Sequence, residues 1–249
     1  MSFSDLEISS DIEESGDRLP ADRSYAQESG VYPVRVDLAY EIESSGGARG
    51  LVVHFVDEPF KGFTVKHTFY LTSGRAKGQK NYYTNSDGVR QYLPGFNQAD
   101  HLARIITGKH ITQLKTEEKV VKLWNFEEKK ELPTKVQVCP DLIGGVLQIG
   151  LLKIVQNRRA NVDGQWVNTA TKQEINDIDK LFYEDGLTVT EKTAGETEAK
   201  FLALWKDKND GRTVNKYEEI SESTSSGTPG LPASSGTASA PMTDKPLFS

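Results

Sequence analysis

Hydrophobic and polar positions alternate along most of the first half of the chain, a pattern typical of β-strands with one buried face. The alternation is imperfect over 31–42, where Pro33 suits the start of a strand. It returns over 50–57 and 63–71, and short glycine-bearing or charged connections separate the three segments. This spacing predicts a meander of three antiparallel strands.

A helical periodicity follows over 96–108, with Gly108 as a natural C-terminal stop. Two further alternating segments, 119–126 and 132–139, predict strands on either side of a charged turn. Residues 145–158 predict another long strand, because their glycines disfavour a helix.

The last part of the ordered chain is less clearly patterned. Residues 162–166 have the composition of a turn, and 176–185 are compatible with either a strand or a helix. Residues 197–208 predict an amphipathic helix.

Three strands, a loop with a helix, and two strands follow the order of the OB fold, a small barrel that binds single strands or oligosaccharides. We therefore predict a mainly β chain: an OB-fold-like five-stranded Greek-key barrel with extra strand(s), one or two helices and disordered termini. In this assignment 43–50 connects the first and second strands, and 127–131, with Lys129 and Lys130, connects the fourth and fifth. An immunoglobulin-like sandwich is the alternative, although a helix in the middle of the chain argues against it.

Charge and composition divide the chain into four parts. Residues 1–29 are acidic and poor in apolar residues, so we expect them to be disordered. Residues 30–217 are predicted to form the barrel with a C-terminal extension, and 218–240 a linker rich in Ser, Gly and Pro. Residues 241–249 form a tip with a Met, a Leu and a Phe, which predicts a partner-binding segment.

A basic and aromatic loop over 72–95 is the strongest functional candidate. Its cations suit a phosphate backbone, and its tyrosine rings offer faces on which unpaired bases can stack. The chain has a net charge of −6, but 61–122 alone carries +7. A basic region between acidic ends is typical of nucleic-acid binding, and it also occurs in charge-balanced proteins without that function.

No motif predicts catalysis, a metal or a cofactor. The chain has no phosphate-binding P-loop, dinucleotide fingerprint or nucleophile elbow, and its four histidines and single cysteine lack zinc spacing. Asp177 and Asp179 fit a charged strand face better than a metal site, and Cys139 lies in a strand-like run that predicts a core position. We expect a cytoplasmic protein with no membrane segment, since neither a signal peptide nor a long apolar run occurs.

The segments GVYPVRVDLAYEIESSGGARGLVVHF and GQKNYYTNSDGVRQYLPGF resemble single-stranded DNA-binding proteins of bacteriophage replication modules, over roughly 30–160. The ending also resembles the tip of bacterial single-stranded DNA-binding proteins, although Leu247 separates Pro246 from Phe248 and a serine follows. The resemblance implies an OB fold and sequence-tolerant binding of single strands during replication, recombination and repair. It also implies recruitment of replication, recombination or transcription proteins through the tail, in the cytoplasm of a host cell if the protein is viral.

These observations together predict a non-enzymatic single-stranded DNA-binding protein, with RNA left open because no 2′-hydroxyl sensor is recognisable. An interaction protein or virion component with a basic loop is the alternative, and an enzyme such as a nuclease is a third. The predicted partner-binding residues are Pro246, Leu247 and Phe248. The predicted nucleic-acid-binding residues are Lys66, Phe69, Tyr70, Arg75, Lys77, Lys80, Tyr82, Tyr83, Arg90, Tyr92, Trp124, Lys129 and Lys130.

Overall fold

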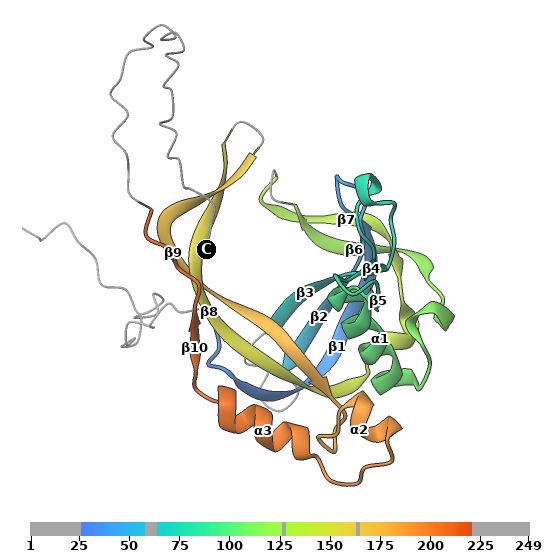
Figure 1. Cartoon of the computed structure of the whole chain (residues 1–249). Helices are drawn as coiled ribbons and strands as arrows, with labels where there is room; N and C mark the ends of the chain where they lie inside the picture. The colour runs from blue at the N-terminus through green and yellow to red at the C-terminus, as the bar shows by residue number, and fades with distance from the viewer. Residues whose placement is uncertain (1–25, 58–63, 126–127, 163–164, 221–249) are drawn as a thin grey trace, which may run out of the picture.

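The computed structural model describes residues 26–57, 64–125, 128–162 and 165–220 (Figure 1). The predicted partner-binding tip, and most of the predicted N-terminal segment and linker, lie outside the described residues. The described chain is mainly β, as predicted: eight strands belong to one sheet, and two more form a separate hairpin. It contains three α-helices, rather than the one or two that were predicted.

The predicted meander is confirmed. Strands β1 (Gly30–Glu43), β2 (Arg49–Asp57) and β3 (Thr64–Tyr70) pair antiparallel in sequence order. A bulge between Val36 and Leu38 explains the imperfect alternation of β1. Val34 and Val36 face the core before the bulge, and Ala39 faces it afterwards.

Two long strands complete the barrel. β8 (Val146–Val162) pairs with the first half of β1, and β9 (Gln165–Phe182) pairs with β8 along almost its whole length. β9 returns to lie against β3, where His67 Nδ1 is 3.8 Å from Asp177 Oδ1. All five strands contribute to one apolar core, so the structure is a partly open, OB-fold-like barrel.

The assignment of the fourth and fifth barrel strands to 119–126 and 132–139 is wrong. These segments form β6 (Glu117–Asn125) and β7 (Lys130–Val138), a hairpin that joins the sheet where Val138 pairs with Tyr40. The hairpin packs on the outer side of the barrel, where Tyr40, Val52 and Val138 form a second small cluster. Alternation identified the strands correctly, but it carries no information about which strands pair.

Helix α1 (Pro94–Thr107) follows the basic loop and covers the barrel core, and Gly108 ends it in the left-handed conformation (φ 72°) as predicted. Ala99, Leu102 and Ala103 are fully buried among the strand side chains. At the helix start a Cβ on Gly95 would lie 2.4 Å from the carbonyl oxygen of Tyr70. Only glycine therefore lets the helix approach the end of β3 this closely.

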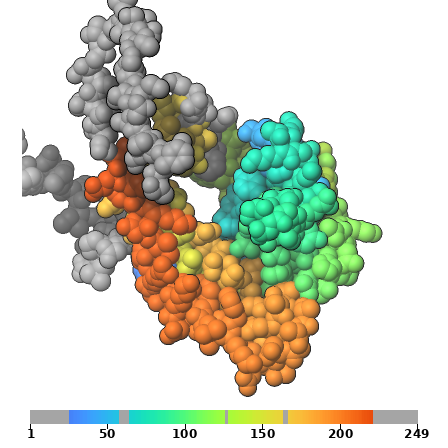
Figure 2. All heavy atoms as spheres, viewed as in Figure 1, coloured from blue at the N-terminus to red at the C-terminus, as the bar shows by residue number. Residues whose placement is uncertain are grey.

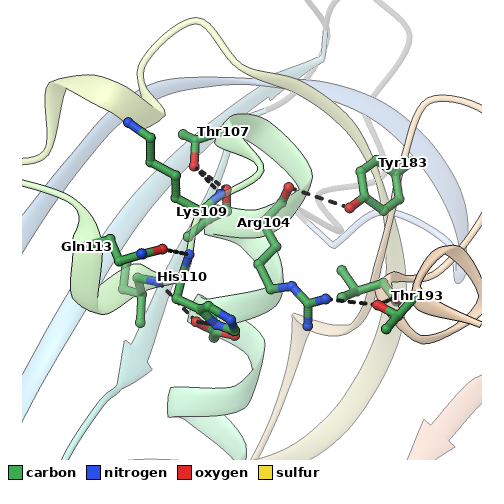
Figure 3. Close-up of polar contacts among 11 residues, drawn as sticks. Arg104, Thr107, Lys109, His110, Gln113, Tyr183 and Thr193 are labelled. Carbon is green, nitrogen blue, oxygen red and sulfur yellow. Dashed lines mark hydrogen bonds and ion pairs between the residues drawn. The ribbon is translucent and has the colours of Figure 1, made fainter.

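Polar contacts fix the chain on both sides of the C-terminal end of α1 (Figure 3). The buried carboxylate of Asp100 accepts a hydrogen bond from the backbone N–H of Ile111 at 3.0 Å and lies 3.0 Å from His110 Nδ1. Arg104 Nη2 donates to Thr193 Oγ1 at 2.8 Å, which joins α1 to the short helix α2 (Val189–Thr193). The Asp100 contacts hold the segment after α1 in place as it runs back toward β6, and the Arg104 contact holds α2 against α1.

The two ends of the described chain meet on the barrel. Helix α3 (Lys200–Asn209) confirms the amphipathic helix predicted over 197–208, and β10 (Thr213–Asn215) then pairs parallel with β8. Ser29 accepts at its backbone oxygen from Gly211 N at 2.8 Å, and its hydroxyl donates to the backbone oxygen of Arg212. Residues 26–29 are thus bound to the barrel, although the predicted domain began at residue 30.

Cys139 lies in the core, as predicted, and burial raises the pKa of its thiol to about 11 from 9.0. The unfolded chain therefore loses this proton between pH 9 and pH 11 while the folded chain keeps it. We expect the free energy of unfolding to be unaffected by this group below pH 9 and to fall by up to about 2–3 kcal/mol as the pH rises to 11. Urea denaturation of the wild type and Cys139→Ala across this range tests it, because the variant lacks this contribution. Parallel pH profiles would contradict the expectation.

Candidate nucleic-acid interface

The basic loop, residues 72–93, is anchored to the turn between β1 and β2. The 3₁₀ helix η1 (Arg75–Lys77) donates its first backbone N–H to the oxygen of Gly46 at 2.8 Å. The side-chain amide of Gln79 donates to the oxygen of Gly47, also at 2.8 Å. The loop therefore presents its side chains from a fixed position at one end of the barrel.

The second half of this loop is a short hairpin, β4 (Tyr82–Thr84) and β5 (Arg90–Tyr92). At its tip Asn85 Oδ1 accepts from the backbone N–H groups of Asp87 and Val89, at 3.0 and 2.8 Å. Gly88 supplies the left-handed residue that the turn requires (φ 77°). The hydrogen bonds and the glycine that form this turn thus all come from the hairpin itself.

Aromatic rings and cations alternate over the hairpin. Lys80 Nζ lies 5.7 Å from the centre of the Tyr82 ring, and Arg90 Cζ lies 5.1 Å from it. Tyr92 is 60% exposed, with its ring centre 4.9 Å from that of Phe96. Tyr83 is also exposed, and its hydroxyl donates to Gln91 Oε1 at 2.7 Å. Each ring is oriented by a neighbour and still leaves surface open to a ligand.

Two hollows meet at Lys80 and Tyr82. One, of about 600 Å³, lies between this loop, the ends of β2 and β3, and the segment after α1. The other, of about 700 Å³, lies between η1 and the β4–β5 hairpin. Lys80, Tyr82 and Thr72 line both hollows. Figure 2 shows a further concavity between the teal lobe of this loop and the yellow and orange surface opposite, and no described residue of β8 or β9 lines the two hollows at Tyr82.

The prediction for Phe69 is wrong, because this side chain is fully buried in the core. The pleat of β3 instead directs Lys66 and Tyr70 outward, and both are exposed. Arg75 is paired with Glu43, so it would have to exchange this carboxylate for a phosphate. Lys77 and Lys80 are exposed and have no ion pair among the described residues.

Lys66 carries a positive charge on the outer face of the barrel, next to His54. His54, the partner of Lys66 in the β2–β3 register, has a lowered pKa because of burial and because of the Lys66 charge. Its Nε2 atom is buried and has no hydrogen-bond partner within the described part of the chain. His54 is therefore neutral at pH 7, and the positive charge here comes from the lysine.

Trp124, Lys129 and Lys130 lie on the β6–β7 hairpin, which is not the connection between the fourth and fifth barrel strands. Trp124 is 54% exposed near the end of β6. Lys130 Nζ is 3.0 Å from Glu128 Oε2, so part of its charge is neutralised locally. None of the three lines the hollows that meet at Tyr82.

The true fourth-to-fifth connection is the end of the long β8–β9 arm, which sequence reasoning missed. Trp166 is 60% exposed there, and Arg158 and Arg159 are exposed on the facing strand. The sequence contains a signal for it, since Asp163 and Gly164 form a dipeptide typical of two-residue hairpin turns. The turn composition was recognised, but the strand that returns from it was not.

The arm is braced along its length by the chain that follows α3. Asn157 is buried, and its Oδ1 accepts from Glu218 N at 2.9 Å. Its amide donates to the backbone oxygens of Glu218 and Thr169, at 2.8 and 2.9 Å. Farther along, Tyr217 donates its hydroxyl proton to the oxygen of Ala170 at 3.0 Å. Since Glu218 is bound in this way, the predicted linker cannot begin at residue 218.

Within the described residues, no helix is both long and apolar enough to span a membrane. The same part of the chain has no group of three or more His, Cys, Asp or Glu side chains placed to hold a metal ion. Comparisons with protein-family models, curated proteins and solved structures give no match. Function therefore has to be argued from the site itself.

The hydrogen bonds of Asn157 are expected to stabilise the arm. Asn157→Ala removes three hydrogen bonds from a buried position, so we expect a loss of about 1–3 kcal/mol in the free energy of unfolding. Amide hydrogen exchange should also accelerate in 158–172 more than in the barrel core. Asn161→Ala, at an exposed position of the same arm, is the matched control and should change neither measurement. Equal exchange in the two variants would show that Asn157 does not fix the arm.

Proposed function

We propose that this protein binds single-stranded DNA without sequence preference and without catalysis, as a component of DNA replication, recombination and repair. The observation that carries the proposal is the anchored β4–β5 hairpin, on which Lys80 and Arg90 flank the ring of Tyr82. Phosphates are attracted by the cations, and bases stack on the exposed rings. This combination at the end of an OB-fold-like barrel favours an oligonucleotide over other ligands.

A single strand suits this surface better than a duplex. In a duplex the base faces are stacked on each other, so aromatic side chains reach them only after unpairing. The path that we propose runs from the β4–β5 hairpin across the exposed side of β3, with Tyr70 and Lys66, toward the β8–β9 arm. Trp166 and the two arginines of the arm would hold the far end of the strand.

Partner recruitment through Pro246, Leu247 and Phe248 is a separate part of the proposal, and the cytoplasm of a host cell is its expected setting.

An interaction protein or virion component is the second candidate. One observation favours it: Leu204 on α3 is 69% exposed, a large fraction for a leucine side chain. The two candidates differ in whether the isolated protein binds oligonucleotides.

The first test measures the affinity and its salt dependence by fluorescence anisotropy, with a labelled 20-nucleotide strand and with its duplex. We expect at least tenfold tighter binding of the single strand. The logarithm of the affinity should fall with that of the salt concentration with a slope near −3, for about four neutralised phosphates at −0.7 each. The double variant Lys77→Glu/Lys80→Glu should flatten this slope. Lys206→Glu/Lys208→Glu on α3 is the matched control and should leave it unchanged. Equal affinity for duplex, or no dependence on salt, would contradict the proposal.

The second test removes aromatic side chains at the two ends of the proposed path and measures the loss of affinity. Tyr82→Ala and Trp166→Ala should each weaken binding by about 1–3 kcal/mol, and Trp166→Phe should lose less because it keeps an aromatic face. Leu204→Ala is the control for removal of an exposed apolar side chain. If both alanine variants bind as tightly as the wild type while keeping its circular dichroism spectrum, the rings pack against the protein and do not hold bases.

A further inference from the structure

The hollow of about 600 Å³ beside Lys80 is the open mouth of the barrel. Glu41 pairs with Leu51, and Leu51 pairs with Phe69, so the three residues share the inner face of the sheet. Leu51 and Phe69 are buried in the core, and Leu51 also lines the hollow together with Glu41 and the neighbouring Arg49. The barrel interior therefore opens to solvent at this end, a frequent place for ligand sites in barrels.

The walls of this cleft combine apolar and polar groups. Leu71, Phe96, Ile111 and Leu114 form apolar walls above Cys139. Polar side chains lie among them, namely Gln79, Asn81, Thr112 and Thr116. The Asn81 side chain has no hydrogen-bond partner among the described residues, so its donors and its acceptor are open to a ligand.

The charged groups of the cleft are one ion pair in its lining and one lysine at its edge. Arg49 Nη2 lies 3.1 Å from Glu41 Oε1, which neutralises the one carboxylate of the lining. Lys80 stands at the edge shared with the second hollow, next to the ring of Tyr82. The interior is thus nearly neutral, and a cation marks its entrance.

A nucleobase has the chemistry that this arrangement requires. It is flat and largely apolar on its faces, and it carries donors and acceptors on its edge that a side-chain amide can pair with. The cleft is within the usual size range of small-ligand sites and is larger than one base needs. A free phosphate fits poorly, because the cation lies at the rim and the walls are apolar.

We propose that the cleft takes one unstacked base of the bound strand. The strand crosses the edge formed by Lys80 and Tyr82, with Lys80 on the phosphate and Tyr82 against the neighbouring base. The unstacked base then lies between the apolar walls with its edge toward Asn81. This inference rests on the proposed function and adds to it a site at which a base leaves the stack.

A thiol footprint tests the occupant directly. In a Cys139→Ala background, Thr116→Cys places a single thiol at an exposed position of the cleft lining, and Thr213→Cys places one on the distant strand β10. A saturating 12-nucleotide strand should slow the reaction of the Thr116→Cys variant with a small thiol reagent at least fivefold. The same strand should leave the reaction of the Thr213→Cys variant unchanged. Anisotropy on the same samples records whether the strand is bound.

Filling the cleft is the independent second measurement. Thr116→Trp should weaken strand binding on the order of tenfold, the effect of losing one stacked base, while Thr213→Trp should not change it. Both positions are exposed, so circular dichroism and thermal unfolding should match the wild type.

Four outcomes would overturn the inference. A bound strand that leaves the Thr116→Cys variant fully reactive would show that the cleft is empty. Protection by a bound strand whose nucleotides are abasic would mean that the backbone, not a base, covers it. Protection by a free deoxynucleoside monophosphate, but not by the strand, would make the occupant a mononucleotide. A wild-type protein that binds no strand would instead overturn the proposed function, and the cleft's occupant with it.

Discussion

Burial of α1 against the inner faces of the barrel strands is the interaction on which the rest of the structure depends. Ala99, Leu102 and Ala103 are fully enclosed, so the helix cannot shift without opening the core. The start of α1 fixes the end of the basic loop, because Gly95 touches the backbone of Tyr70. Asp100, in the middle of the helix, fixes Ile111 and with it one wall of the cleft. One packing interaction thus positions both sides of the candidate interface.

The interface combines local rigidity with open ligand groups. Backbone hydrogen bonds hold the basic loop on the β1–β2 turn, and an asparagine turn closes the β4–β5 hairpin. The cations of these elements are not equally free to bind a phosphate. Arg75 is paired with Glu43, whereas Lys77 and Lys80 have no ion pair among the described residues. Preorganised rings reduce the entropy lost when a strand is ordered, so modest contacts can suffice for binding.

Local patterns predicted the elements well and their partners poorly. The meander, α1 and the loop were identified because alternation, helical spacing and glycine positions are local signals. The pairing of β8 with β1 depends on contacts far apart in sequence, which explains why β6 and β7 were taken for barrel strands. In the site, strict alternation along β3 could have placed Phe69 inside, because its neighbour Tyr70 faces outward. Trp166 was missed because its strand was not recognised.

The contact between Ser29 and the segment around Arg212 also has a consequence for biosynthesis. The two residues are 183 positions apart, yet they hold the same edge of β8. At about 5–20 residues per second, a ribosome needs roughly 10–40 seconds to make the intervening chain. The arm of β8 and β9 is complete once Phe182 has been made, and Glu218, which braces it, follows 36 residues later, roughly 2–7 seconds at the same rate. The nascent barrel is therefore incomplete, and open to aggregation and proteolysis, until residues 211–218 emerge.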